Sequence, residues 1–473
     1  MFIGVATDLV EMRRDERGCH DCTQQLPRGI FRPLDRRMSA DSALPRSVEA
    51  GAWKPLQVIA VGLCFLLNML DGADLLVMSF VAPVLSDEWA IAPQDLGVIF
   101  SASLAGMACG CLFIAPLADR FGRRPLIICA LAVVAVAMVI SSQVHSVEAM
   151  ILARFVVGLG VGTIGVTMTA MASEFAPPRY QDFAVGFVQA GWPFGSIITA
   201  FLTVSLLPDH GWRTVLLAIG ALSLGLLVIA LALMPESIDF LLRRQPTKAL
   251  DRANRLRARL GHEPLGALPS KPEAASRTSL LRLFDDGRLR SGVILWIAVA
   301  LGYFVLYFVI NWIPELTTRA GLPLDQAIYA GATYNLGAFL GTSLMGWLAV
   351  RFALPRVIAL FFFAAAVAML IFGNLSMPLV LTLLAALAVG VTVQGGFNGF
   401  WALSARFYPT EIRSTGIGWS MGVGRIGAVL GPLVGGYLVG TDLPVGTVFI
   451  IFAVPAVIAG LLALLVIIPE KRA

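Results

Sequence analysis

Charged residues are scarce in this chain. Asp, Glu, Lys and Arg together make up 14% of its 473 residues, whereas soluble domains average about 25%. Hydrophobic residues make up 58%, which is far more apolar surface than one soluble core needs. The composition therefore excludes an ordinary soluble domain and indicates a membrane protein.

Residue patterns for catalysis, metal binding and nucleotide binding are also missing. The four histidines are His20, His145, His210 and His262. His20 lies within the lone "CHDC" at residues 19–22, which lacks a second ligand pair, and the other three histidines have no ligand nearby in sequence, so no zinc site is expected. Without a GxxxxGK[ST] loop, ATP is not the expected energy source. We therefore expect no enzyme, no cofactor and no metal, and a gradient as the driving force.

Apolar runs long enough to cross a bilayer recur along the chain. A transmembrane helix needs about 20 apolar residues, and clusters of turn-forming or charged residues separate such runs here. We predict spans at residues 57–80, 96–118, 126–142, 149–172, 183–206, 213–234, 291–314, 326–350, 355–373, 378–402, 413–438 and 445–468. The sequence thus predicts an all-α membrane protein with twelve transmembrane helices.

Lysine and arginine are distributed unevenly between the predicted loops. With the N-terminus inside, the cytoplasmic segments hold 31 of the 35 residues, and the outside loops hold only Arg213 and Arg319. Positive residues are retained on the cytoplasmic side, so we expect both termini there. The net charge of +5 then follows from topology and gives no reason to propose a nucleic-acid partner.

The predicted spans fall into two sets of six with internal similarity. "APLADRFGRRPLI" at 115–127 aligns with "GWLAVRFALPRVI" at 346–358, and Pro177 and Pro409 lie in two further similar segments at nearly the same offset. Two matches at one offset predict pseudo-symmetric halves with a site between them, as in secondary transporters. The expected organisation is a disordered tail at 1–54, six-helix halves at 55–235 and 291–473, and a cytoplasmic linker at 236–290.

Several motifs resemble a known family. "LADRFGRR" at 117–124, Arg154 with Gly158 and Gly160, and "PES" at 235–237 resemble the major facilitator superfamily. "DGAD" at 71–74, "NWIPELTTRAGLP" after the seventh span and "YPTEIRSTGIGWSMGVGRIGAVLGPLVGG" at the eleventh resemble its aromatic acid:proton symporter branch.

The resemblance implies uptake of a small aromatic carboxylate with a proton. The carrier would be a monomer surrounded by lipid in the bacterial inner membrane. The chain departs from the family pattern at Ala115, where Gly is usual, and at Val350, where an acid would stand.

Two carboxylates interrupt the first apolar run. Asp71 and Asp74 are three residues apart and share one helix face, and Arg154 in the fourth span is expected at the same depth. Because a proton on the acid would release the arginine, we predict that these three residues couple transport to protons. The alternatives are a permanent ion pair, or a first helix that ends near Leu70 and leaves both acids in a loop.

Other polar groups in the predicted spans are candidates for substrate binding. Arg425 presents a planar fork suited to a carboxylate, although it could instead bridge to Asp71 or Asp74. The further candidates are Tyr303, Tyr307, Asn311, Gln189, Trp192, Tyr334, Asn335, Gln394 and Asn398. For each of these, an interhelical hydrogen bond is the alternative.

A gate is predicted at the cytoplasmic loop after the second span. Asp119 is expected near helix N-termini, where the helix dipole favours a carboxylate, with the arginines near inner acids. The predicted gating residues are Asp119, Arg120, Arg123, Arg124, Glu174 and Arg413. Topology alone would also explain the arginines.

Two rival functions remain at this point. An exporter of the same superfamily would typically carry a Gly-Pro-rich fifth span, which here reads "GFVQAGWPFGSIITA". A sensor would bind aromatic acids without moving them, and a helix predicted within "TKALDRANRLRARL" at 247–260 could bind a partner.

Overall fold

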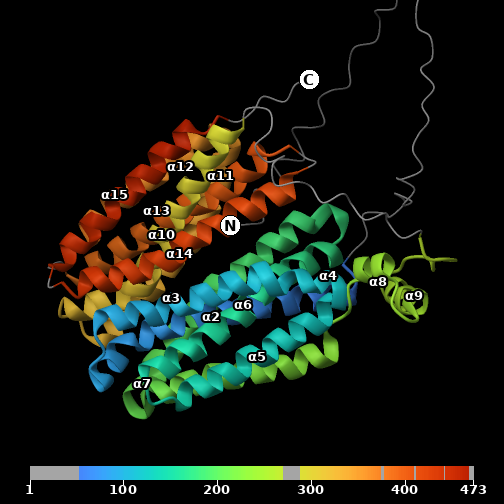
Figure 1. Ribbon diagram of the computed structural model, residues 1–473, viewed down its shortest axis with the longest axis horizontal. Helices are drawn as coiled ribbons and strands as arrows, with labels where there is room; N and C mark the ends of the chain where they lie inside the picture. The colour runs from blue at the N-terminus through green and yellow to red at the C-terminus, as the bar shows by residue number, and fades with distance from the viewer. Residues whose placement is uncertain (1–52, 270–287, 374–377, 410–411, 442, 468–473) are drawn as a thin grey trace, which may run out of the picture. The chain divides into compact units, whose positions relative to one another are not determined.

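The computed structural model describes residues 53–269, 288–373, 378–409, 412–441 and 443–467 (Figure 1). Within these residues the chain is helical and contains no strand. Almost all of the predicted tail and residues 270–287 of the predicted linker lie outside the described part.

The helices fall into a first half, a linker and a second half along the chain. The helices of the first half come first. Their bounds are α2 (Pro55–Trp89), α3 (Pro93–Cys109), a π-helical turn (Gly110–Ile114), a 3-10 turn (Ala115–Leu117), α4 (Ala118–Phe121), α5 (Arg123–Gln143), α6 (Val147–Phe175), a 3-10 turn (Pro178–Tyr180) and α7 (Gln181–Leu233). The linker contributes α8 (Ile238–Arg244) and α9 (Ala249–Arg259). The second half contains α10 (Leu289–Arg319), α11 (Leu324–Arg351), α12 (Leu354–Phe372), α13 (Leu379–Phe407), α14 (Arg413–Val439) and α15 (Val445–Leu465).

The helices agree with the predicted spans, although two of the helices have to be counted differently. Ten helices in the described residues are long and apolar enough to cross a membrane. One of them, α7, contains two helices joined at Gly211, whose φ of 73° breaks the helical backbone. The other difference is α11, which is 28 residues long but too polar to be among the ten. Counting α7 as two and adding α11 gives the twelve expected helices.

Two local features refine the predicted spans. The alternative in which the first helix ends near Leu70 is excluded, because α2 continues to Trp89 and places both acids in mid-helix, as the span at 57–80 predicted. The second span is not one α-helix: α3 ends at Cys109 and continues as a π-helical turn and a 3-10 turn. Single π-helical turns interrupt helices frequently at functional sites.

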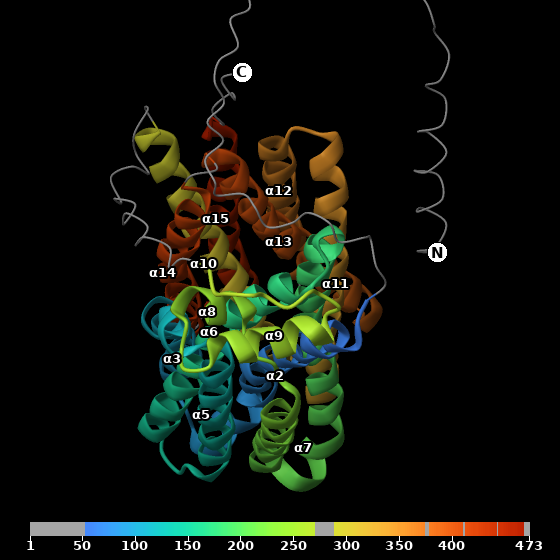
Figure 2. The same cartoon turned by 90° about the vertical axis from the view of Figure 1, so that its right-hand side faces the viewer.

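The helices form two bundles, α2–α7 and α10–α15 (Figures 1 and 2). Successive spans reverse direction, so their ends gather at two faces. We call the end that carries α8 and α9 the linker face, and the opposite end the far face. At the far face, Glu88 at the end of α2 accepts hydrogen bonds from Trp212 Nε1 (2.7 Å) and Arg213 Nη1 (2.8 Å).

The two bundles meet closely toward the far face. Ser79 Oγ on α2 donates to the backbone carbonyls of Ile310 and Asn311 on α10, at 3.0 Å each. Ser101 Oγ on α3 donates to the Val429 carbonyl on α14 at 2.7 Å. A Cβ at Gly436 of α14 would lie 2.5 Å from the Pro93 carbonyl oxygen, so a glycine is needed for this approach.

A cavity of about 620 Å³ separates the bundles on the other side. Its walls are residues 186–193 of α7, 338–343 of α11 and 394–401 of α13. These segments lie in the linker-face halves of their helices and reach to about mid-helix, since α7 begins at Gln181 and α11 and α13 end at Arg351 and Phe407. The described state is therefore closed at the far face and hollow toward the linker face.

Gly72, between the two acids of α2, is required by packing. A Cβ at this position would lie 2.2 Å from the Trp192 carbonyl oxygen of α7, and backbone atoms cannot swing aside. The sequence "DGAD" thus allows α2 and α7 to touch at the level of the acids.

We expect Gly72→Ala to destabilise the protein by about 1–3 kcal/mol through overpacking, with a lower apparent midpoint of thermal unfolding in detergent. Gly62→Ala on the same helix is the control, because nothing lies within 4 Å of its added Cβ and alanine favours a helix by up to about 1 kcal/mol. Equal midpoints for the two variants would contradict this account of the α2–α7 contact.

Candidate functional site

Asp71 and Asp74 are buried in the centre of α2, with exposed fractions of 7% and 1%. Asp71 Oδ1 and both carboxylate oxygens of Asp74 have no hydrogen-bond partner in the described part of the chain. Buried polar atoms are rarely left unsatisfied, and a carboxylate in the membrane interior is costly unless it is paired or protonated. These oxygens are therefore poised to take up a proton, a water or a cationic partner.

Arg154 on α6 lies beside Asp74, as the depth argument predicted, but it contacts the main chain. Its Nη2 donates to the Asp74 carbonyl oxygen at 2.5 Å, its Nε to Ser103 Oγ at 3.1 Å and its Nη1 to Met138 Sδ at 3.2 Å. No ion pair within 4 Å joins Arg154 to either acid of α2 in the residues described. In this state Arg154 fixes the backbone of α2 and leaves the Asp74 carboxylate free.

A small cavity lies between Asp74 and Arg154. Its volume is about 10 Å³, and Ser103 and Met107 of α3 also line it. This is about the minimum space for one water molecule. A water in this cavity could hydrogen-bond to the Asp74 carboxylate, which the protein groups around it do not.

Arg425 on α14 supplies a positive charge from the second half. Its Nη1 is buried without a hydrogen-bond partner in the structure as described. Asp71 Oδ1 on α2 is likewise buried without a partner, and no ion pair within 4 Å links the two side chains among the described residues. Each half thus contributes one buried, unpaired charge, and the two charges have opposite signs.

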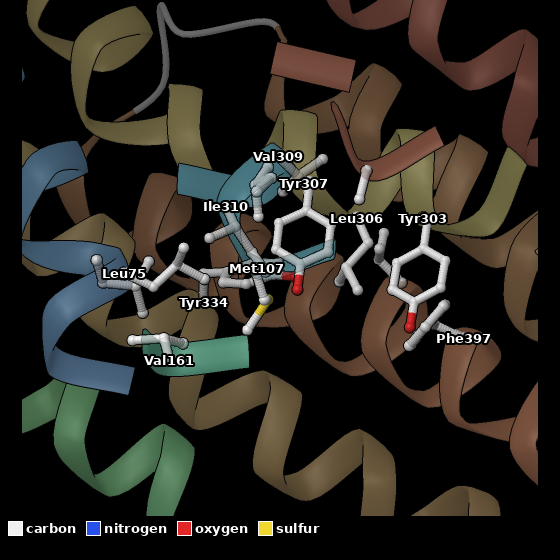
Figure 3. Close-up of a cluster of buried hydrophobic side chains, with 14 of the residues drawn as sticks. Leu75, Met107, Val161, Tyr303, Leu306, Tyr307, Val309, Ile310, Tyr334 and Phe397 are labelled. Carbon is white, nitrogen blue, oxygen red and sulfur yellow. The ribbon is translucent and has the colours of Figure 1, made fainter. Parts of the chain in front are cut away.

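Two stacked phenols lie beside Arg425. The rings of Tyr303 and Tyr307 on α10 are 5.8 Å apart at an interplanar angle of 16°, and Tyr303 also contacts the Phe397 ring at 4.4 Å. A Cβ at Gly424 would lie 2.8 Å from Tyr303 Cδ2, which places this ring against the α14 backbone. Figure 3 shows the two hydroxyls pointing to the same side. We call Asp71, Tyr303, Tyr307 and Arg425 the central cluster.

Three other predicted residues are buried near the centre. Asn311 Nδ2 donates to the Tyr307 carbonyl and Asn335 Nδ2 to the Gly331 carbonyl, each one turn earlier in its own helix. Asn335 Oδ1 and the Tyr334 hydroxyl have no partner in the described part of the protein. One N–H of each amide is therefore used locally, and the unsatisfied oxygen atoms belong to α11.

Four predicted residues line the cavity instead, namely Gln189, Trp192, Gln394 and Asn398. Asn398 Nδ2 donates to Thr342 Oγ1 at 2.6 Å, and Gln394 Nε2 to Asn398 Oδ1 at 3.5 Å. Gln394 Oε1 is buried without a partner in the described chain. The predicted substrate residues thus fall into three groups. Some belong to the central cluster, three others are buried, and four line the cavity.

Two polar residues near these groups were missed. Asn68 Nδ2 donates to Gln189 Oε1 at 3.2 Å and to the Val188 carbonyl at 2.7 Å, and Thr342 holds Asn398. Asn68 is three residues before Asp71 and therefore on the same helix face, which is the signal that would have identified it.

The predicted gate forms a connected network at the linker face. Arg123 Nη1 on α5 pairs with Glu174 Oε2 on α6, as expected. Glu174 also accepts hydrogen bonds from Ser237 Oγ at 2.7 Å and from the Asp239 backbone N–H at 2.8 Å. One carboxylate therefore ties α5, α6 and the start of α8 together.

The acid at the N-terminus of α5 is Glu236 rather than Asp119. Its Oε1 accepts from the backbone N–H groups of Arg123 (3.0 Å), Arg124 (3.2 Å) and Ser237 (2.9 Å). These are the donors that a helix start leaves free and that favour a negative charge.

The remaining predicted gating residues make different contacts. The backbone carbonyl of Asp119 accepts from Arg244 Nε, and Arg120 lies over the Phe121 ring. Arg124 Nη2 donates to the Leu231 carbonyl. The side chain of Arg413 lies outside the described part.

Removal of the Glu236 carboxylate should loosen the linker face. We expect Glu236→Ala to cost about 1–3 kcal/mol, because three backbone donors lose their acceptor, and to speed protease cleavage between the halves. Asp239→Ala is the matched control: its carboxylate is exposed and, among the described residues, pairs only with Arg243 at 3.6 Å, so less than about 1 kcal/mol should be lost. Equal cleavage rates in the two variants would rule out the capping role.

Comparisons with known proteins agree with this architecture. The model of a family described as the Major Facilitator Superfamily matches residues 63–418, with a second match at 295–473. The 4-hydroxybenzoate transporter PcaK of Pseudomonas aeruginosa is 31% identical over 417 residues, which cover 87% of this chain and 93% of that protein. The gallate transporter of Pseudomonas putida is 31% identical over 434 residues, covering 91% and 94%.

The fold is similar to solved structures at lower identity. The inward open conformation of the xylose transporter XylE from E. coli superimposes with a TM-score of 0.66 at 19% identity, covering 87% of this chain and 97% of that chain. At this identity the likeness shows the fold alone.

Proposed function

Because this chain belongs to the Major Facilitator Superfamily, a family of transporters rather than enzymes, we propose that it imports aromatic or related carboxylic acids with protons across the bacterial inner membrane. Relatives named for 4-hydroxybenzoate and gallate support the substrate class. The observation that carries the proposal is that Asp71 and Arg425, from opposite halves, are both buried with polar atoms that have no partner in the described part of the chain.

Arg425 binds the carboxylate of the substrate. Its buried Nη1 has a free donor, a guanidinium presents two parallel donors to a carboxylate, and the interaction is stronger in a site that excludes water. The neighbouring rings of Tyr303 and Tyr307 offer flat surfaces on which an aromatic ring packs. Charge and shape at the central cluster therefore suit one carboxylate on a flat body.

Asp71 and Asp74 carry the coupled proton. A substrate carboxylate beside ionised Asp71 would place two negative charges next to one arginine, so entry of the anion favours a protonated Asp71. When the substrate leaves, Arg425 can stabilise the ionised Asp71 and the proton is released. Substrate and proton thus bind together and leave together.

Alternating access follows from the contacts between the bundles. The far face is closed by the serine bonds and the glycine contact, and the cavity opens toward the linker face. We place the linker face in the cytoplasm because the loops at this end hold nearly all lysines and arginines. The described state is then the one that releases substrate, and opening of the far face exposes the central cluster to the outside.

Neutralising the acids should abolish coupling. We expect Asp71→Asn and Asp74→Asn each to lower accumulation of radiolabelled 4-hydroxybenzoate in proteoliposomes at least about tenfold under an imposed pH gradient, because a proton can no longer be exchanged. Exposed Asp325→Asn on α11 is the control and should accumulate normally.

An uncoupler separates this function from its rivals. It should collapse accumulation by the unmodified protein, whereas better retention with the uncoupler would indicate an exporter and binding without accumulation a sensor. Undiminished pH-driven accumulation by both asparagine variants would refute the proton role of the acids.

Arg425 should determine affinity for the carboxylate. In the purified protein, 4-hydroxybenzoate should raise the midpoint of thermal unfolding, because a ligand stabilises the state that it binds. We expect Arg425→Gln to lose this shift and Arg425→Lys to need on the order of ten times more ligand, since lysine keeps the charge but loses the planar fork. Exposed Arg356→Gln is the control. A full shift in Arg425→Gln would place the substrate elsewhere.

A further inference from the structure

The helices of the linker lie across the linker-face ends of the first bundle (Figures 1 and 2). Arg244 Nε on α8 donates to the Asp119 carbonyl of α4 at 2.8 Å. At the other end, a Cβ at Gly261 just after α9 would lie 3.3 Å from Lys54 Cε, immediately before α2. The α8–α9 segment is therefore anchored at the level where membrane-spanning helices begin and end.

α9 has one buried and one strongly basic face. Ala249, Ala253 and Leu260 are buried. Arg252, Arg255 and Arg259 are exposed, and their spacing of three and four residues places them in one stripe along the helix, about a third of a turn from the buried face. We call these three residues the arginine stripe.

The arginine stripe is electrostatically uncompensated in the structure. None of its three side chains has a hydrogen-bond or ion-pair partner within the described residues, and Asp251 is the only acid in α9. Like charges three and four residues apart on a helix repel one another. The stripe is therefore more stable against an anionic surface than in water alone.

We propose that the arginine stripe binds the headgroups of anionic phospholipids at the linker-face surface of the membrane. Charge complementarity identifies the partner, since guanidinium groups match the geometry of phosphate oxygens. Position supports it, because α9 lies at the level of the spanning helices' ends and basic amphipathic helices bind anionic interfaces. The stripe thereby anchors the segment between the halves to the bilayer.

Hydrogen exchange of the full chain in nanodiscs tests this binding. The amides of α9 should exchange several-fold more slowly with phosphatidylglycerol than with phosphatidylcholine alone, and 0.5 M salt should reduce the difference. The triple variant Arg252→Gln, Arg255→Gln, Arg259→Gln should lose it, because each arginine contributes about a fivefold factor to affinity for an anionic surface and three contribute roughly a hundredfold.

A control triple variant removes the same charge elsewhere on the linker face. Arg179→Gln, Arg290→Gln and Arg356→Gln change exposed arginines outside α8 and α9, and should keep the lipid-dependent protection. The proposal is overturned if α9 exchanges equally in both lipids, which would point to an acidic segment of this chain or to solvent as the neighbour. It is also overturned if the control triple loses as much protection.

Discussion

The structure depends on opposite charges that are buried without partners inside an apolar protein. Removing a charge from water costs several kcal/mol unless a partner compensates it, so the acids of α2 and Arg425 store a strong tendency to find partners. The surrounding packing prevents them from simply collapsing together. Arg154 binds the α2 backbone at Asp74, and Gly72 holds α2 against Trp192. The site can therefore use the missing partners for a substrate and a proton.

The sequence predicts the helices well because the hydropathy of many residues together identifies each span. Each span integrates about 20 residues of hydropathy, so one polar residue changes little. Local backbone features are harder to predict. The π-helical turn at Gly110–Ile114 leaves no such signal, and the predicted span at 57–80 stops nine residues before the end of α2 at Trp89, because hydropathy marks the membrane-crossing part of a helix and not its last turns. The pairing of Arg123 with Glu174 was predictable because both residues are confined to one short cytoplasmic end.

Individual contacts in the site could not be predicted. The position of a residue along its helix gives its depth in the membrane, but not the direction in which its side chain points. Arg154 reaches the expected level and yet binds a carbonyl oxygen. Asn311 and Asn335 also lie at the expected level, and each donates one hydrogen bond to a carbonyl of its own helix. Gln394 and Asn398 face the cavity, while Phe397, between them in sequence, packs on Tyr303. Rotation about the helix axis decides these outcomes, and it depends on packing between helices that one chain's periodicity does not specify.

Two helices, α2 and α10, take part in both the far-face closure and the central cluster, which gives the charges a mechanical consequence. Ser79 lies about 12 Å along α2 from Asp71, and Ile310 lies about 10 Å along α10 from Tyr303. Because the Ser79 hydroxyl bonds to α10, movement that separates α2 from α10 at the far face must also change the gap between Asp71 and the tyrosines. Binding of substrate and proton at the central cluster therefore changes the relative stability of the closed and open far face. No other structural element has to connect the two sites.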